Sequence, residues 1–259
     1  MELWKDKDYL REEFVDKRRT AREISIELGV NDSTVEYYLG KYSLYRLRGR
    51  TKFTCNDSKF NITNPIFNYY AGLIATDGYI DLPNNRVSLR LKNDGAEKLL
   101  DTLKDYFEFT GEVRVYRKSY DLTITSKKLI EELECMNITG YRKTYKLKFP
   151  RKFSSEECER LFLRGVLDGD GNIKSPSKNR SGGQFRLVTA SKDFIQGVIN
   201  SINTNLKMDY RISIARVNGK EYPKLEMKIQ DSLKFYEWIY KDYEEFRLDG
   251  KYNKYLQIR

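Results

Sequence analysis

The fold is decided by two nonapeptides, YAGLIATDG at residues 70–78 and LRGVLDGDG at residues 163–171. Each is a mostly apolar stretch that closes with Asp-Gly, a pattern typical of a buried helix that ends at a glycine. One such stretch would be an ordinary helix end. Two copies, whose last acids Asp77 and Asp170 are 93 residues apart, indicate instead that the chain contains an internal duplication.

Small residues recur four positions apart in both nonapeptides, at Gly72 and Thr76 and at Gly165 and Gly169. This spacing permits close approach, so we expect the two helices to pack together with their C-termini adjacent. Each terminal carboxylate would then face the negative end of its own helix dipole and a second carboxylate, which costs stability unless a cation neutralises them. A divalent metal bound through oxygen ligands is the expected cation.

The same order of elements follows each nonapeptide. From about residue 62 to 134, and again from about 154 to 240, the sequence predicts a helix, two strands, a helix, two strands and a closing helix. The fold class is therefore α+β, with two pseudo-symmetric αββαββα halves that each contain an antiparallel sheet. Two similar halves can pack about a pseudo-twofold axis and imitate a homodimer.

One predicted strand of each copy alternates polar with apolar residues, which predicts a polar face and a buried face. The polar positions are Arg86, Ser88, Arg90 and Lys92 in the first copy and Gln184 and Arg186 in the second.

Residues 1–50 precede the repeat and predict a small all-helical domain. One helix starts near residue 18 and ends at Gly29, and a second begins with Asp32 or Ser33 as its N-cap. This arrangement resembles the DNA-binding helix-turn-helix, whose second helix enters the major groove, so Ser33 and Thr34 are predicted DNA contacts. Plain packing of two antiparallel helices is the alternative.

A run of cations follows these helices, at Arg46, Arg48, Arg50 and Lys52, with no acid among them. A solvated linker is one interpretation. Cations beside a candidate recognition helix favour a linker that contacts DNA phosphates.

The amino-acid composition limits the partners and the kinds of catalysis that are compatible with this chain. The 259 residues include 48 Lys and Arg against 38 Asp and Glu, a net charge of +10, which favours a polyanionic partner. The absence of histidine excludes Ser-His-Asp triads, Cys-His nucleophiles, His-ligated zinc and HNH-type nucleases. With no signal-peptide core and no apolar run of roughly 18 residues, the protein is expected to be soluble and cytoplasmic, with no membrane partner.

Over roughly residues 62–256 the chain resembles the single-chain, two-motif type of the LAGLIDADG homing endonuclease family. In that family the eighth motif residue is the metal-binding catalytic carboxylate, which falls on Asp77 and Asp170 here, and the preceding residues Thr76 and Gly169 are expected among the metal ligands. The resemblance implies hydrolysis of phosphodiester bonds in both DNA strands with Mg²⁺. Mn²⁺ is the expected substitute, whereas Ca²⁺ would bind without supporting cleavage.

The resemblance also implies a basic residue near each metal site, soon after each half. Lys143 and Lys251 occupy these places and are predicted to be catalytic; a solvated basic link is the alternative. The first nonapeptide departs from the family motif at Ala75 and Thr76, where the family name has Asp and Ala. Because the catalytic position is kept, this departure puts little in doubt.

By the same resemblance, the two sheets form a saddle along the major groove of double-stranded DNA with a long asymmetric target site, and the protein is a monomer. The side chains expected to contact DNA from the sheets are Arg86, Ser88, Arg90, Lys92, Gln184 and Arg186. Arg and Gln suit bidentate contacts with guanine and adenine, although a register error of one residue would move each side chain to the other face.

Five segments are predicted: a helix-turn-helix-like domain (1–50), a basic linker (51–61), the first half (62–140), a basic inter-half linker (141–153) and the second half (154–259).

The main alternative function is a non-cutting DNA-binding regulator or an RNA-splicing maturase on the same scaffold. Such degenerate members usually lose a motif acid, and this chain keeps both. Intein splicing is disfavoured because the chain has no His and does not end in Asn. The ExK tripeptide of another nuclease class, at residues 226–228, is expected by chance in a chain that is 33% charged.

Overall fold

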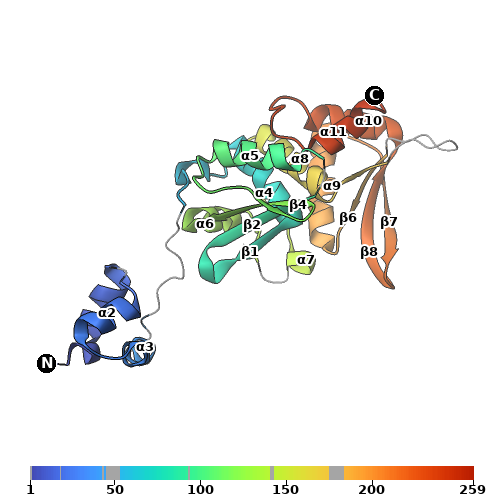
Figure 1. The fold of residues 1–259 in the computed structure, drawn as a ribbon. Helices are drawn as coiled ribbons and strands as arrows, with labels where there is room; N and C mark the ends of the chain where they lie inside the picture. Colours follow the sequence, from blue (N-terminus) through green and yellow to red (C-terminus); the bar gives the residue numbers. More distant parts are fainter. Residues whose placement is uncertain are drawn as a thin grey trace. The chain divides into compact units, whose positions relative to one another are not determined.

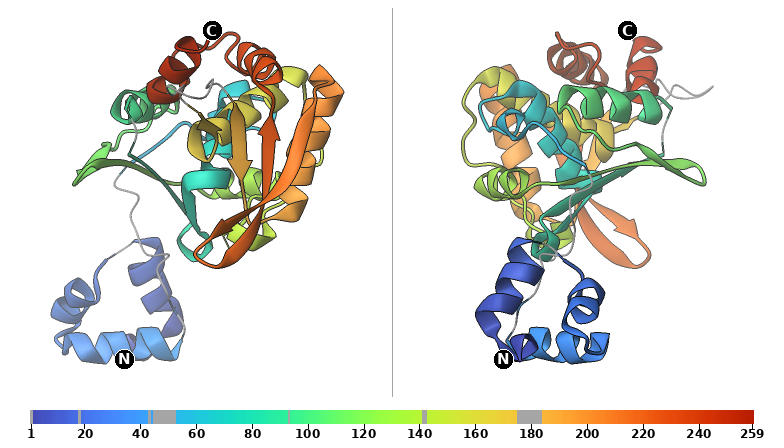
Figure 2. Two further views of the ribbon diagram at one scale, coloured as in Figure 1. Left: turned by 90° about the vertical axis from the view of Figure 1, so that its right-hand side faces the viewer. Right: turned by 60° about the vertical axis from the view of Figure 1, so that its left-hand side comes forward.

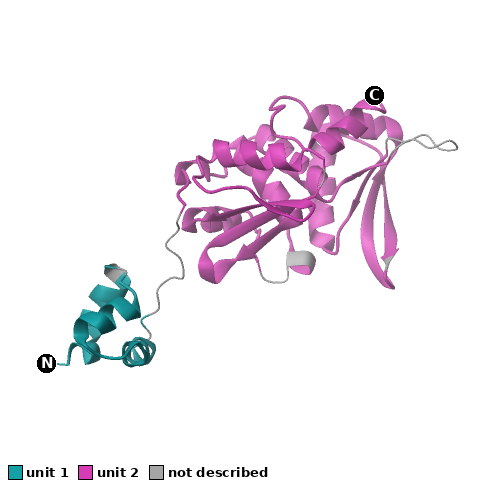
Figure 3. Ribbon diagram, in the orientation of Figure 1, with its two compact units in different colours: residues 1–52 teal, residues 53–259 magenta. Residues whose placement is uncertain are grey.

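The computed structural model describes residues 2–17, 19–42, 44, 53–92, 94–140, 143–174 and 184–259, with only the backbone described at Asp16, Lys143, Thr144 and Val217. The predicted DNA contacts at Arg46, Arg48, Arg50 and Lys52 therefore lie outside the described residues. The chain divides into two compact units, Met1–Lys52 and Phe53–Arg259 (Figure 3).

The first unit is all-helical. Its elements are η1 (Leu3–Lys5), α1 (Lys7–Arg11), η2 (Glu12–Asp16), α2 (Ala21–Leu28) and α3 (Asp32–Lys41). They enclose a small core of four buried side chains, Leu10, Ile24, Val35 and Leu39.

The turn between α2 and α3 forms where the sequence predicts it, but the start of α3 differs. Gly29 ends α2 in the left-handed conformation, with φ of 66°, which glycine adopts without strain. The N-cap of α3 is Asn31, so the prediction of Asp32 or Ser33 is wrong. Asp32 is the first helical residue, and its carboxylate accepts a hydrogen bond from Ser25 Oγ at 2.5 Å, which links the two helices.

The second unit begins with η3 (Asp57–Lys59) and contains the predicted repeat (Figure 1). The first half consists of α4 (Pro65–Asp77), β1 (Gly78–Asp81), η4 (Leu82–Asn84), β2 (Arg86–Leu91), α5 (Ala96–Tyr106), β3 (Arg114–Tyr116), β4 (Ser119–Thr125) and α6 (Lys127–Cys135). After α7 (Lys143–Lys146), the second half consists of α8 (Glu156–Gly169), β5 (Asn172–Ile173), β6 (Phe185–Val188), α9 (Lys192–Leu206), β7 (Tyr210–Val217), β8 (Lys220–Met227) and α10 (Ile229–Ile239), followed by α11 (Asp249–Leu256). The α+β class and the αββαββα order of both halves are confirmed.

The two sheets have the same topology. Both are four-stranded and antiparallel, in the orders β1-β2-β4-β3 and β5-β6-β8-β7. In β2 the apolar residues Val87, Leu89 and Leu91 are buried, as the alternation predicts. Helices α4 and α5 pack against strands β2 and β4, and α9 packs against β8 (Figure 2). One face of each sheet is therefore covered by helices, and the polar side chains of β2 lie on the opposite face.

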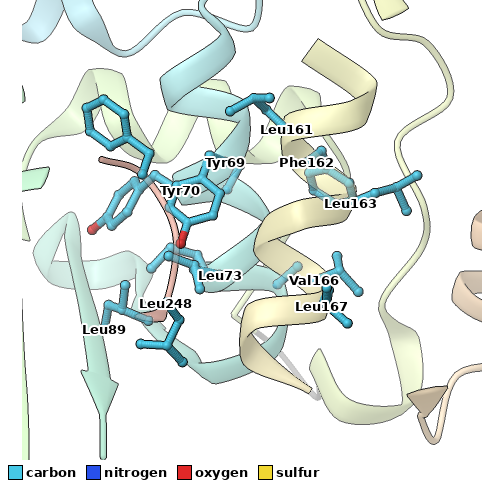
Figure 4. Close-up of a cluster of buried hydrophobic side chains, with 14 of the residues drawn as sticks. Tyr69, Tyr70, Leu73, Leu89, Leu161, Phe162, Leu163, Val166, Leu167 and Leu248 are labelled. Atoms are coloured by element: carbon cyan, nitrogen blue, oxygen red, sulfur yellow. The ribbon is translucent and has the colours of Figure 1, made fainter. Parts of the chain in front are cut away.

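Helices α4 and α8 lie side by side in the centre of the second unit (Figure 4). Buried side chains from both helices, among them Tyr69, Leu73, Phe162 and Val166, belong to one continuous core. None of the helices in the described part of the chain combines the length and apolar character needed to cross a membrane.

Candidate active site

The two motif helices cross at glycines. A Cβ atom on Gly72 would overlap the carbonyl oxygen of Phe162 and lie 3.0 Å from Gly165 Cα. Reciprocally, a Cβ atom on Gly165 would overlap the carbonyl oxygen of Tyr69 and lie 2.8 Å from Leu73 N. The close approach predicted from the small residues is confirmed, because neither position has room for a side chain.

The acidic ends of both helices meet. Helix α4 ends at Asp77, and Asp170 is the C-cap residue of α8; both carboxylates are exposed. A Cβ atom on Gly169 would overlap Thr76 Oγ1 and lie 3.0 Å from Asp77 Oδ2. The last turn of α8 therefore contacts the last turn of α4, and a glycine at position 169 leaves space for the Asp77 carboxylate.

Lys251 of α11 reaches the same place. Its ammonium group donates a hydrogen bond to the carbonyl oxygen of Gly171, the residue after Asp170. Burial lowers the pKa of Lys251, whereas the negative charges of Asp168, Asp77 and Asp170 raise it. The structure thus brings Lys251 together with both motif acids, although Lys251 is 81 positions after Asp170 in the sequence.

The other candidates differ in what they can offer a metal. Thr76 Oγ1 donates hydrogen bonds within its own helix, to Leu73 O at 3.0 Å and Gly72 O at 3.3 Å. Gly169 can contribute only its backbone. The side chain of Lys143, whose backbone begins α7, lies outside the described residues.

A buried carboxylate that the sequence analysis did not single out, Asp168, lies next to the site. Its Oδ2 atom accepts hydrogen bonds from the Tyr69 hydroxyl at 2.8 Å and from the Leu248 N–H at 2.9 Å, and its Oδ1 atom accepts one from the Tyr240 hydroxyl at 2.9 Å. Burial raises the pKa of Asp168 to about 6, although these hydrogen bonds and the Arg164 guanidinium lower it.

Arg164 is buried one helical turn before Asp168. Its guanidinium donates to five backbone carbonyl oxygens, those of Ile239, Lys241, Asp242, Tyr243 and Phe246. These bonds hold the end of α10 and the following loop against α8. An Arg and an Asp four residues apart in an otherwise apolar stretch is the sequence signal that could have indicated this network, because buried charges need partners.

Of the polar side chains predicted for the sheets, Arg86, Ser88 and Arg90 belong to β2 and Arg186 belongs to β6. Lys92 and Gln184 lie one residue outside these strands. Arg86, Arg90 and Lys92 are exposed, whereas Ser88, Gln184 and Arg186 are half-buried. Ser88 shares a hydrogen bond with the hydroxyl of Thr123 on the neighbouring strand, at 2.8 Å.

Acids accompany the arginines on these strands, which the alternation of polar and apolar residues does not indicate. The ion pairs are Arg86 with Asp81 at 2.7 Å, Arg90 with Asp121 at 3.1 Å and Arg186 with Glu226 at 2.6 Å. In the last pair the N–H of Arg186 Nε does not point at the carboxylate well enough to form a hydrogen bond. In each sheet one acid also lies between two arginines in the strand register. Asp121 is opposite Arg90 and Arg114, and Glu226 is opposite Arg186 and Arg211.

The residues at the helix ends fit a divalent cation. Within the described ranges, no cluster of three or more acidic or cysteine side chains could hold a metal by itself. Mg²⁺ does not need such a cluster, because it binds through one or two carboxylates and keeps water or substrate phosphate in its other positions. The two exposed carboxylates at abutting helix C-termini match that donor set.

Comparisons with known proteins agree with this architecture. A family model described as a LAGLIDADG-like domain matches residues 157–239, which extend from α8 to the end of α10. No curated protein matches the sequence.

Several solved structures are similar. The homing endonuclease I-WcaI bound to its DNA recognition sequence has 17% identity and a TM-score of 0.55, over 77% of this chain and 90% of that chain. Full-length DUF199/WhiA from Thermatoga maritima has 17% identity and a TM-score of 0.50, over 77% of this chain and 66% of its own length. I-DmoI in complex with DNA and Ca has 20% identity and a TM-score of 0.49, over 71% of this chain and 92% of that chain.

The paired motif helices and the two matching sheets are those of the LAGLIDADG fold, which I-WcaI and WhiA share. Within that fold, residues 157–239 are similar to the family model of the LAGLIDADG-like domain.

Proposed function

We propose that the protein is a site-specific double-strand DNA endonuclease that hydrolyses phosphodiester bonds with the help of Mg²⁺ held by Asp77 and Asp170. The observation that supports this proposal most strongly is the meeting of two exposed carboxylates at the abutting ends of α4 and α8, with Lys251 beside them. Two like charges at the negative ends of two helix dipoles are unfavourable without a cation.

Each side chain at the helix ends has a part in the proposed reaction. Asp77 and Asp170 hold and orient the metal, which when bound activates water and neutralises charge on the scissile phosphate. The Lys251 ammonium group, near both acids, stabilises negative charge that develops on the phosphate oxygens. Mn²⁺ is the proposed substitute for Mg²⁺, and Ca²⁺ the ion that binds without supporting cleavage.

The sheets supply the proposed DNA-binding surface. Their uncovered faces carry Arg86, Arg90 and Arg186, and Gln184 directly precedes β6. Arg and Gln side chains hydrogen-bond base edges or phosphates, and the whole chain has a net charge of +10. Double-stranded DNA with a long asymmetric site is the proposed substrate, because the two halves present different side chains. The protein would act as a monomer, since both motif acids come from one chain.

The first unit is proposed as an additional recognition module. In helix α3, Ser33 is exposed and Thr34 is half-buried in the first turn, where the N-terminal residues of a recognition helix contact bases. The tight turn at Gly29 between α2 and α3 is compatible with such a role.

Incubation of the purified protein with a genomic or random-sequence DNA library and Mg²⁺, followed by sequencing of the cut ends, tests the proposal. We expect staggered cuts at one recurrent site, and no cuts in a parallel reaction with Asp77→Asn. Enrichment of a bound site without any cut ends would favour the second candidate, a DNA-binding regulator on the same scaffold. That candidate is retained because WhiA shares the fold. Binding of structured RNA in preference to DNA would instead favour a maturase.

A further inference from the structure

The two halves of the second unit are not equivalent around the motif helices. Counted from the motif acids, Ala71 and Ala75 of the first nonapeptide occupy the positions of Arg164 and Asp168 in the second. The buried Arg164 and Asp168 therefore have no counterparts in α4. Buried ionisable side chains are costly unless they have well-placed hydrogen-bond partners. The partners of these two side chains indicate what they contribute to one half of the site.

The contacts of Asp168 lead from α8 to Lys251. The Leu248 N–H donates to Asp168 Oδ2 at 2.9 Å, and Leu248 is the residue that precedes α11. The carbonyl oxygen of Leu248 in turn accepts from the Lys251 N–H at 2.9 Å and the Tyr252 N–H at 3.1 Å, which makes the first turn of α11.

These contacts lead back to α8. The Lys251 ammonium group donates a hydrogen bond to the carbonyl oxygen of Gly171, which is three residues after Asp168. Leu248 is itself fully buried and belongs to the same core as the two motif helices (Figure 4). Upstream, Arg164 holds the carbonyl oxygens of Tyr243 and Phe246, so the segment that enters α11 is bound to α8 on both sides of Arg247.

We infer that Asp168 is a positioning residue: by accepting the Leu248 N–H, it fixes the start of α11 and sets Lys251 beside the motif acids. The inference rests on the proposed endonuclease activity. Because α4 carries alanine at the equivalent position, the effect belongs to one half of the site. Loss of this hydrogen bond should therefore slow the cutting of one DNA strand more than the other.

The test compares Asp168→Ala with Asp168→Asn on a supercoiled plasmid that carries the cut site. Alanine removes the acceptor, as in the first half, whereas the Asn side-chain oxygen can still accept the Leu248 N–H. Asp168→Ala removes the acceptor of three hydrogen bonds, of which the bond from the Leu248 N–H leads to Lys251. We expect this variant to accumulate nicked circles with one strand cut about tenfold more slowly, the effect of losing that bond to a charged group. Asp168→Asn should restore most of the rate.

Two further measurements separate positioning from general damage. In the Lys251→Met background, Asp168→Ala should cause no additional loss on the same strand, because both changes remove the same group from the site. If Asp168→Ala does not fold, an ester in place of the Leu248 amide, introduced by joining a synthetic C-terminal peptide, removes the same hydrogen bond from the other partner and should give the same strand bias.

A chemical readout does not depend on cutting. Acylation of lysines by an N-hydroxysuccinimide ester, quantified by mass spectrometry, should rise at Lys251 relative to the exposed Lys254 when Asp168 is replaced by Ala. Provided that the wild-type protein cuts, any one of three results would overturn the inference. These are equal slowing of both strands, additive losses with Lys251→Met, and unchanged labelling of Lys251. Absence of cutting by the wild-type protein would overturn the proposed function, and with it the strand bias, whatever the labelling shows.

Discussion

At the residue scale, Lys251 combines partial burial with nearby negative charge. Burial lowers its pKa, and the carboxylates of Asp168, Asp77 and Asp170 act in the opposite direction. The exposed Lys254 lies almost one turn further along the same helix, which makes it a matched control.

Replacement of Lys251 by Met keeps the length of the side chain and removes its charge. We expect cleavage to slow about 10²–10³-fold, the range for loss of one group that stabilises transition-state charge, with a much smaller loss of DNA affinity. Lys254→Met should change either quantity only slightly. Single-turnover cleavage rates and binding isotherms give the comparison, and equal losses of rate and affinity would identify Lys251 as an ordinary phosphate contact.

At the scale of elements, the crossing of α4 and α8 determines where the acids lie. Gly165 contacts the backbone of α4, so a methyl group there must push the helices apart. Gly40 of α3, by contrast, has open space around its Cβ position.

Gly165→Ala should therefore lower the free energy of unfolding by about 3 kcal/mol or more, at the upper end of the range for overpacked cores. Gly40→Ala should leave stability unchanged or raise it by up to about 1 kcal/mol, because alanine is the better helix former. Denaturant unfolding of both variants tests this expectation. Wild-type stability of Gly165→Ala would show that the helices are not in backbone contact.

The acids on the sheet faces offer a second test at this scale. Asp121 is buried between two arginines in the register and pairs with Arg90. Asp121→Asn should raise affinity for non-specific DNA about threefold to tenfold at low salt, because the arginines become free to contact phosphates. Asp105→Asn removes the same charge from the exposed surface of α5 and should have little effect. Equal gains for both variants, measured by fluorescence anisotropy, would indicate only a change in net charge.

The periodic spacing of apolar, polar and small residues in the sequence predicted the strands and the motif helices, but it did not predict contacts between residues far apart in the chain. The alternation around Arg86 and Arg90 and the small residues of the nonapeptides gave the strands and the helix crossing, because both patterns are local. The partners of Asp168 are Tyr69, Tyr240 and Leu248, at least 70 residues away, and only the folded chain brings them together. The N-cap of α3 was missed because Asn31, Asp32 and Ser33 are all good N-cap residues, and the contact of Asp32 with Ser25 decides between them.

At the scale of the whole molecule, the chain consists of two units, residues 1–52 and 53–259. Both motif acids belong to the second unit, so a protein of residues 53–259 should still cut at high concentration or low salt. It should protect a shorter stretch of DNA than the full chain. Its salt dependence should be flatter by about 0.9 in log–log slope for each lost phosphate contact, since Arg46, Arg48, Arg50 and Lys52 are removed. Footprinting at matched ionic strength gives the comparison, and identical footprints and slopes would exclude a DNA-binding role for the first unit.

The central claim is that Asp77 and Asp170 together support cutting of both strands, and plasmid cleavage tests it most directly. On a plasmid that carries the site selected from the library, with Mg²⁺ present, the wild-type protein should convert supercoiled DNA to the linear form. Asp77→Asn and Asp170→Asn should each abolish the linear product while DNA affinity stays within about threefold of wild type, because binding depends on many contacts elsewhere. Normal double-strand cleavage by either variant would contradict the claim.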